Sequence, residues 1–163
     1  MAKNLQMRIE ELNQFRIVGV MTNFKNALHD EYDGMSKIPQ VWEELNTRSA
    51  EIGNISPGFA YGVMLGEEEG LTRYLAGFAT AGDFTTPKGM EAIAIPAGLW
   101  AIFTHYGSLE NLQESNRYAY QEWLPDSEYE MRMSPHIDFY SPKSEGNEEE
   151  MEMEFWIPIE LKH

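Results

Sequence analysis

The stretch Gly98-Leu-Trp-Ala-Ile-Phe-Thr-His-Tyr106 gives the clearest indication of how this chain folds. Its β-branched and aromatic residues, bounded by glycines at 98 and 107, predict a β-strand. A helix is predicted to begin at Ser108, with Glu110 and Glu114 in its early turns, where carboxylates favour a helix N-terminus. The candidates for its packed face are Leu109, Leu112, Tyr118, Ala119 and Trp123.

Two further strands are predicted to close this second half of the chain, at residues 137–140 and 151–159. The segment between them, residues 141–150, is polar and acidic and contains Pro142 and Gly146, so we expect a mobile loop there. The second half therefore has the order strand, helix, strand, strand.

The first half repeats this order. Residues 7–21 are rich in β-forming residues and predict one strand that ends near Gly19. Ile38-Pro-Gln-Val-Trp-Glu-Glu-Leu45 has apolar residues at i, i+3, i+4 and i+7, the spacing of a helix face, with its proline tolerated in the first turn. Strands are then predicted at residues 59–65 and 73–81, around a turn at 66–70 whose glycines permit positive φ.

The doubled order predicts an α+β protein with a pseudo-two-fold axis and a cleft between its halves. Residues 1–163 are expected to form a single domain with halves at about 1–82 and 96–163, because no linker rich in Gly, Pro or Ser separates them.

The composition excludes several classes of protein. Hydrophobic residues make up 42% of the chain and aromatic residues 12%, which is too apolar and too aromatic for disorder. No cysteine is present, so disulfides and thiolate metal sites are excluded. The first residues lack the apolar run of a signal peptide, and the longest apolar region, residues 92–103, is too short to span a bilayer. We therefore expect a cytoplasmic protein without membrane contact.

The formal net charge is −15, from 27 acidic and 12 basic residues. Such a surface repels phosphate backbones, so no direct nucleic-acid partner is expected. It also raises the local concentration of cations through long-range attraction. Because acidity alone can simply keep a small protein soluble, only a specific inward-facing carboxylate would indicate a cation site.

Asp138 is the candidate for that carboxylate. Period-two geometry places Asp138 and Tyr140 on one face of their strand, and Ile137 and Phe139 on the other. The residues expected to face the helices are Ile137, Phe139, Phe155, Ile157 and Ile159, and those expected to face the cleft are Asp138, Tyr140, Trp156 and Trp100. The alternative is that Asp138 is a solvated residue on the open face of a sheet.

A carboxylate among aromatic rings suits an organic cation, because the carboxylate supplies Coulombic attraction and each ring adds roughly 0.5–2 kcal/mol. Tyr61 is a further aromatic candidate, and Trp123 is either part of the core or part of the cleft wall. Trp42 lies on the apolar face of its predicted helix and is expected in the core.

Short motifs in a characteristic order run along nearly the whole chain: Phe15-Arg-Ile-Val-Gly19, Ile38-Pro with Trp42, Tyr61-Gly-Val63, Ile95-Pro-Ala-Gly-Leu-Trp100, Trp123-Leu-Pro-Asp-Ser127, Asp138-Phe-Tyr140 and Trp156-Ile-Pro-Ile159. Together they resemble the GyrI-like, or AraC-type effector-binding, domain family. The resemblance implies two pseudo-symmetric β-α-β-β units that form an antiparallel sheet with two main helices and a central ligand cleft. Asp138 stands where the family usually carries a glutamate, one methylene longer.

The resemblance also implies a function. In transcriptional regulators the family supplies an effector sensor beside a helix-turn-helix domain, and this chain looks free-standing because it has no room for such a domain. The leading hypothesis is binding of cationic, aromatic or amphipathic small molecules, as a sensor or sequestering protein. The implied ligand-binding residues are Asp138, Tyr140, Trp156, Trp100, Tyr61 and Trp123.

Two other functions stay open. Some members of the superfamily hydrolyse electrophilic small molecules with the cleft carboxylate as general base, and Asp138 could take that role. An acidic protein-interaction or inhibitor module is supported only by the net charge. The four histidines (His29, His105, His136 and His163) are scattered, and no nucleotide-binding glycine motif occurs, so no metal or cofactor is expected.

Overall fold

The structure is a computed structural model that describes residues 5–25, 34–52, 59–80, 86–107, 109–141, 144 and 151–163. The chain divides into two compact units: one contains Met1–Asn13 and Ala97–His163, and the other contains Gln14–Pro96. Of the loop expected at residues 141–150, all but Ser141 and Ser144 lie outside the described residues, as does the expected helix start at Ser108.

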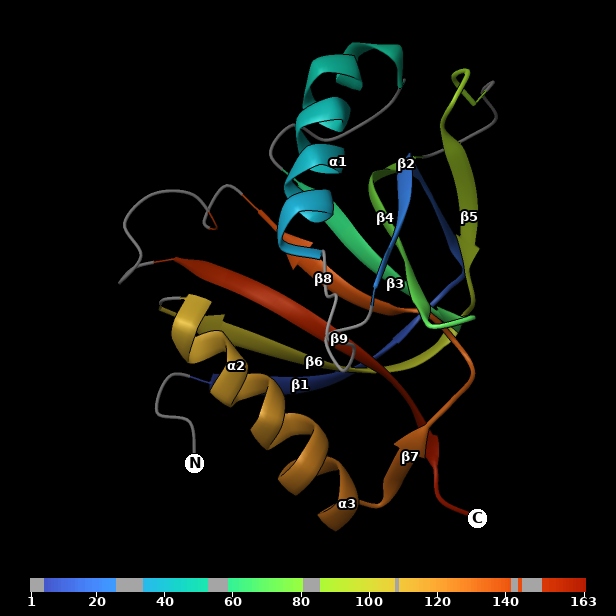
Figure 1. The fold of residues 1–163 in the computed structure, drawn as a ribbon. Coiled ribbons are helices and arrows are strands. Elements are labelled where there is room, and N and C mark those ends of the chain that lie inside the picture. Colours follow the sequence, from blue (N-terminus) through green and yellow to red (C-terminus); the bar gives the residue numbers. More distant parts are fainter. Residues whose placement is uncertain are drawn as a thin grey trace. The chain divides into compact units, whose positions relative to one another are not determined.

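The unit Gln14–Pro96 is an antiparallel sheet with a helix (Figure 1). Strand β2 (Phe15–Lys25) pairs with β4 (Leu71–Thr80) on one side and with β5 (Glu91–Ile95) on the other, and β3 (Ala60–Glu68) pairs with β4. The helical elements are α1 (Gly34–Arg48) and a short 3₁₀ turn, η1 (Ser49–Glu51).

Helix α1 covers this sheet because its apolar stripe is spaced every three to four residues. Val41 and Leu45 are buried in one cluster with Val18, Val20 and Ala76 of the sheet. The expectation that Trp42 belongs to this core is confirmed: its ring packs against the cluster, and its indole Nε1 donates to the Tyr74 hydroxyl at 2.9 Å. The helix begins before Ile38, so Pro39 lies inside it and not in its first turn.

The unit of Met1–Asn13 and Ala97–His163 also consists of antiparallel strands and a helical segment. Strand β6 (Gly98–Tyr106) lies between β1 (Leu5–Leu12) and β9 (Glu152–Leu161). The other edge of β9 pairs with β8 (His136–Tyr140) and with β7 (Tyr129–Met131).

The helical segment of this unit consists of α2 (Leu109–Tyr118), a π-helical turn η2 (Ala119–Trp123) and a short α3 (Leu124–Asp126). It lies over β6 and β9 (Figure 1). Ala119 and Leu124 from the helical segment pack with Ala101, Phe103, Phe155, Ile157 and Ile159 from the strands. We call the side of the sheet that bears these strand residues the helix face.

The α+β class, the antiparallel sheet and the two main helices are therefore confirmed. The expectation of one strand over residues 7–21 is wrong, because β1 ends at Leu12 and β2 begins at Phe15. The two strands belong to different units, since β1 pairs with β6 while β2 pairs with β4 and β5. The single domain and the central cleft stay predictions.

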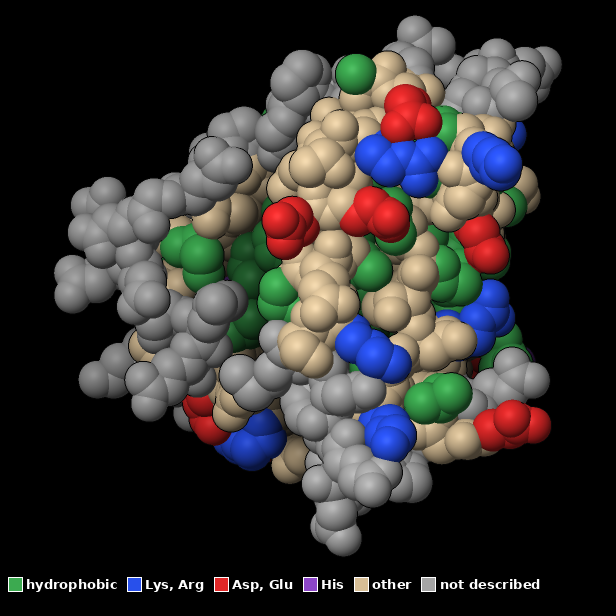
Figure 2. Space-filling model, turned by 45° about the horizontal axis from the view of Figure 1, so that its top comes forward, with side chains coloured by type: hydrophobic (Ala, Val, Ile, Leu, Met, Phe, Trp, Pro, Cys, Tyr) green, Lys and Arg blue, Asp and Glu red, His purple; other side chains and the backbone are tan. Residues whose placement is uncertain are grey.

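Acidic and basic side chains are interspersed on the face that Figure 2 shows. Several basic side chains of the described residues form ion pairs with acidic neighbours: Arg117 with Glu114 and Glu122 at 2.6 Å each, and Arg48 with Glu51 at 2.7 Å. These exposed pairs contribute little to stability, since water screens them. Among the described residues, no helix is both long enough and apolar enough to cross a membrane.

Candidate functional site

Strand register determines which side of the sheet Asp138 occupies. In the β8–β9 pair, Asp138 lies opposite Phe155, and residues directly opposite each other on antiparallel strands project from the same face. Phe155 is part of the core under the helical segment. Asp138 therefore points to the helix face of its sheet.

The same register places the tryptophans on the opposite face. Ile137 lies opposite Trp156, and the rings of Phe139 and Trp156 have centroids 5.7 Å apart. Trp100 packs edge-on against Trp156 at 5.8 Å. The expected orientation was wrong in this respect: Ile137 and Phe139 share a face with Trp156, while Asp138 shares one with Phe155. Alternation shows which residues of one strand share a face of the sheet. Which residues of the neighbouring strand share that face depends on the register, and a shift of one residue in register exchanges the two faces.

Two residues that we did not expect in the site lie beside Asp138. His136 is two residues before Asp138 on β8 and projects from the same face. The Tyr120 hydroxyl oxygen lies 2.6 Å from His136 Nδ1, and the two rings stack with centroids 5.7 Å apart. Tyr120, His136 and Asp138 are all half-buried. We call these three residues the Asp138 cluster.

The π-helical turn η2 carries Tyr120. Pro125, the second residue after this turn, lacks the N–H that would bond to the carbonyl of Gln121, so the regular α-helical ladder cannot continue through this point. A π-turn widens the helix by one residue and changes the direction of the side chains in it, and such turns are frequent at functional sites. This turn directs Tyr120 to His136.

Burial governs the protonation of the Asp138 cluster. It raises the pKa of the Asp138 carboxyl to about 7, because a charged group loses its hydration there. It also lowers the pKa of His136. The pKa of Tyr120 is raised, first by burial and then by the negative charge of Asp138. At neutral pH the imidazole and the phenol are therefore neutral, and Asp138 is the group whose charge changes.

The Asp138 carboxylate has no hydrogen-bond or ion-pair partner among the residues that the structure describes. The neighbouring polar groups, Tyr120 and His136, are bonded to each other. A half-buried carboxylate normally has donors, because burying an unpaired charge is unfavourable. Asp138 is therefore an acid whose oxygens receive no hydrogen bond from the described residues.

The remaining aromatic candidates have different surroundings. Tyr140 is half-buried on the same face of β8 as Asp138. Trp123 packs edge-on against Phe103 at 5.3 Å and stacks on Tyr129 at 6.3 Å, so much of its ring is covered by its own unit. Tyr61 belongs to the other unit, where its ring lies 5.8 Å from that of Phe15.

Trp100 is fully buried, and a guanidinium of the same chain covers its ring. Arg132 Cζ lies 4.7 Å from the ring centroid, and Arg132 Nε donates to the carbonyl of Leu99 at 3.2 Å. Gly98 leaves the space for this arrangement, since a Cβ at that position would lie 2.7 Å from Arg132 Cζ. The cation–π contact of Trp100 is thus made within the chain.

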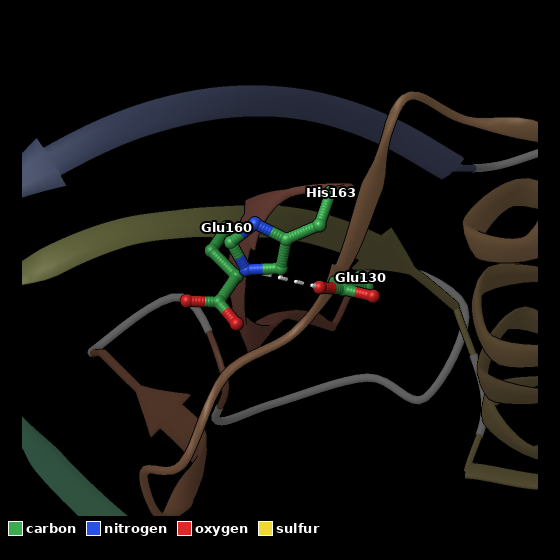
Figure 3. Close-up of side chains that lie close together, drawn as sticks. All are labelled: Glu130, Glu160 and His163. Atoms are coloured by element: carbon green, nitrogen blue, oxygen red, sulfur yellow. Dashed lines mark ion pairs between the residues drawn. The ribbon is translucent and has the colours of Figure 1, made fainter.

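One group of side chains has the composition of a metal site. Glu130 and Glu160 are directly opposite each other on β7 and β9, and His163 Nε2 lies 3.8 Å from Glu130 Oε1 (Figure 3). The sequence motifs did not indicate this group, because Glu130 on β7 is far in sequence from Glu160 on β9 and from His163. Two of the three side chains are exposed, and such groups are common on acidic surfaces, so we assign it no function.

Comparison with known proteins extends these observations. The profile of the GyrI-like small molecule binding domain matches residues 5–160. The chain belongs to the GyrI-like family. The resemblance that the sequence motifs indicated is therefore confirmed, and the protein carries a small-molecule-binding domain.

A curated relative is the transcriptional regulator BrlR of Pseudomonas aeruginosa, which is 30% identical over 159 residues. The match covers 96% of this chain but only 56% of BrlR, so the chain spans about half the length of that regulator.

Two solved structures share the fold. SAV2435 bound to tetraphenylphosphonium has a TM-score of 0.72 at 14% identity and covers 95% of this chain and 94% of its own. EcmrR in a complex with DNA has a TM-score of 0.72 at 15% identity, over 97% of this chain and 58% of that one. At these identities the likeness shows the fold alone.

Proposed function

We propose that this domain binds small organic cations and uses Asp138 as their counter-charge. The observation that carries the proposal is the half-buried Asp138 carboxylate, which has no partner among the described residues while its neighbours Tyr120 and His136 are bonded to each other. A cation at this position would restore the interactions that the carboxylate loses on burial.

Two further points support the proposal. The rings of Tyr120 and His136 lie beside the carboxylate and offer apolar surface to an aromatic or amphipathic ligand. Among proteins of the same fold, SAV2435 has been solved with tetraphenylphosphonium, an organic cation. A role as a sensor or as a sequestering protein would fit the likeness to the transcriptional regulator BrlR.

The proposed ligand-binding residues differ in how directly they act. We propose that Asp138 and Tyr140, which share the helix face of β8, contact the ligand, and that Trp123 borders it. Trp100 and Trp156 lie on the opposite face and would act through the packing of β8, chiefly as fluorescent reporters. Tyr61 belongs to the other unit and stays a predicted ligand-binding residue.

A matched pair of planar ligands tests the role of charge. At pH 8, 9-aminoacridine carries a positive charge, whereas acridine has the same ring system and is neutral. We expect 9-aminoacridine to bind with micromolar affinity, roughly −8 kcal/mol, and acridine to bind about ten-fold more weakly. Ligand fluorescence and tryptophan quenching measure both. Equal affinities would show that the site recognises aromatic shape and not charge.

A second candidate function is hydrolysis of an electrophilic small molecule, and the pKa of Asp138 favours it. A general base works best when its pKa is close to the operating pH, and burial brings that of Asp138 to about 7. In this mechanism Asp138 takes a proton from water while the water oxygen attacks the electrophilic carbon. The C–O bond of the epoxide or ester then breaks, and its oxygen takes the proton back from Asp138. Mass spectrometry of aryl epoxides and aryl esters after incubation tests the idea. Water addition that disappears in Asp138→Asn would support it, and unchanged compounds would oppose it.

A further inference from the structure

The hydrogen-bonding capacity of the Asp138 carboxylate is unused by the described residues. An ionised carboxylate has two oxygens with about four acceptor positions. Tyr120 and His136 make no hydrogen bond to the Asp138 carboxylate, and the Tyr120 hydroxyl lies 2.6 Å from His136 Nδ1. A ligand that carries only positive charge would leave these acceptor positions empty, whereas a ligand with N–H groups would fill them.

Tyr120 supplies a second acceptor beside the carboxylate. Burial lowers the pKa of His136, so the imidazole is neutral and carries one N–H. Whichever partner of the Tyr120–His136 hydrogen bond is the donor, the Tyr120 oxygen keeps at least one free lone pair. A carboxylate and a phenolic oxygen together suit a cation with two or more N–H donors.

The tryptophans of this unit make contacts of their own, while Tyr140 shares its face of β8 with Asp138. Cages for quaternary ammonium groups use the faces of tryptophan and tyrosine rings. Trp100 and Trp156 are on the sheet face opposite to Asp138, and Arg132 already covers Trp100. The ring of Trp123 stacks on Tyr129. The tryptophans of this unit therefore do not form a cage around Asp138.

We propose that the Asp138 cluster selects organic cations that carry N–H donors, namely protonated amines, amidines and guanidines, over quaternary ammonium and phosphonium ions. The inference rests on the proposed function and narrows its ligand class. An N–H cation forms charge-assisted hydrogen bonds of about 2.7–2.9 Å to a carboxylate. In a quaternary ion the methyl or phenyl groups hold the charge farther away, which weakens the attraction and leaves the carboxylate oxygens without donors.

The test compares 2-(1-naphthyl)ethylammonium with its N,N,N-trimethyl analogue, which has the same ring and the same charge. Titration calorimetry at pH 8 should show the primary ammonium binding at least about ten-fold more tightly. Tetraphenylphosphonium serves as a third probe and should bind more weakly than the primary ammonium. If either quaternary ion binds as tightly as the primary ammonium, and loses affinity in Asp138→Asn, the selectivity is overturned while the proposed function stands.

Absence of binding by all three ions, or equal binding by wild type and Asp138→Asn, would instead overturn the proposed function together with the selectivity.

The Tyr120→Phe variant tests the second acceptor. It should lower the affinity for the primary ammonium a few-fold and leave the affinity for the trimethyl analogue unchanged. Tyr118→Phe, two residues earlier in the same helical segment, is the matched control and should change neither. If Tyr120→Phe does not fold, as judged by thermal unfolding, the wild-type ligand comparison decides alone.

Discussion

Replacing Asp138 with asparagine should weaken the binding of 9-aminoacridine ten- to hundred-fold at pH 8, where the carboxylate is ionised. The change keeps the shape of the side chain and removes its charge. A charge-assisted contact in a partly dry site contributes about 1–3 kcal/mol, which corresponds to that range of affinities. Fluorescence titration of wild type and variant measures the loss, and neutral acridine should bind both about equally.

Two further variants separate a dedicated site from the general field of the protein. Glu11→Gln removes one negative charge from an exposed position on β1 and should leave affinity unchanged within error. Asp138→Glu restores the residue common in the family and should retain cation binding with a different size preference, because its carboxylate reaches one methylene farther. Equal losses from Glu11→Gln and Asp138→Asn would mean that net charge alone attracts the cation.

The elements that were predicted well are those with strong periodicity in their own sequence. Strand β6 has the bounds that its glycine-limited apolar run indicates, and α1 contains the predicted stripe of Ile38, Val41, Trp42 and Leu45. Strands β5 and β7 were not predicted, because each is short and its pairing with β2 or β9 provides the hydrogen bonds that define it.

The boundary between β1 and β2 was missed for a related reason. Both segments favour strands, and only Asn13 and Gln14 interrupt them. What separates them is their pairing: Leu12 lies opposite Gly98, whereas Phe15 lies opposite Ile95. Pairing partners so far apart in sequence leave no local signal, so propensity alone joined the two strands into one.

The candidate site could also be predicted only where the local sequence carries a signal. Asp138 was found because an acid among apolar and aromatic residues on a strand is unusual. His136 could have been found with it, since the alternation that groups Asp138 with Tyr140 also includes residue 136. Tyr120 could not, because its direction depends on the π-helical turn before Pro125 and on how the helical segment packs on the sheet. The opposite placement of Trp156 required the register of β8 with β9.

Cation binding should depend steeply on pH, with the affinity falling as the pH decreases through about 7. The ionised form of Asp138 binds the cation, and burial raises its pKa to about 7. The ionised fraction is then about 90% at pH 8 and about 1% at pH 5, so the apparent affinity for 9-aminoacridine should fall by nearly a hundred-fold. The probe keeps its charge over this range, so any change of affinity in titrations at several pH values comes from protonation of the protein.

The protonation of Tyr120 and His136 also bears on how cation affinity depends on pH. Tyr120 stays neutral because its pKa is raised, and protonation of His136 at low pH would add a positive charge that also disfavours the cation. The Asp138→Asn variant separates the two effects, since any pH dependence that it retains belongs to His136 or to the rest of the protein. A profile for wild type that is as flat as that of the variant would exclude Asp138 as the binding group.

The raised pKa of Asp138 also predicts how the stability of the folded protein depends on pH. In the unfolded chain an aspartate titrates near about 4, and in the folded protein Asp138 titrates near 7, so folding favours the protonated form. Its contribution to stability is therefore present below about pH 4 and is lost as the pH rises to about 7. An asparagine side chain cannot titrate, so the free energy of unfolding of Asp138→Asn, measured in urea, should rise relative to wild type between these pH values. A difference that is constant with pH would show that Asp138 is as well hydrated in the folded protein as in the unfolded chain, and the carboxylate would then have no need of a cationic ligand.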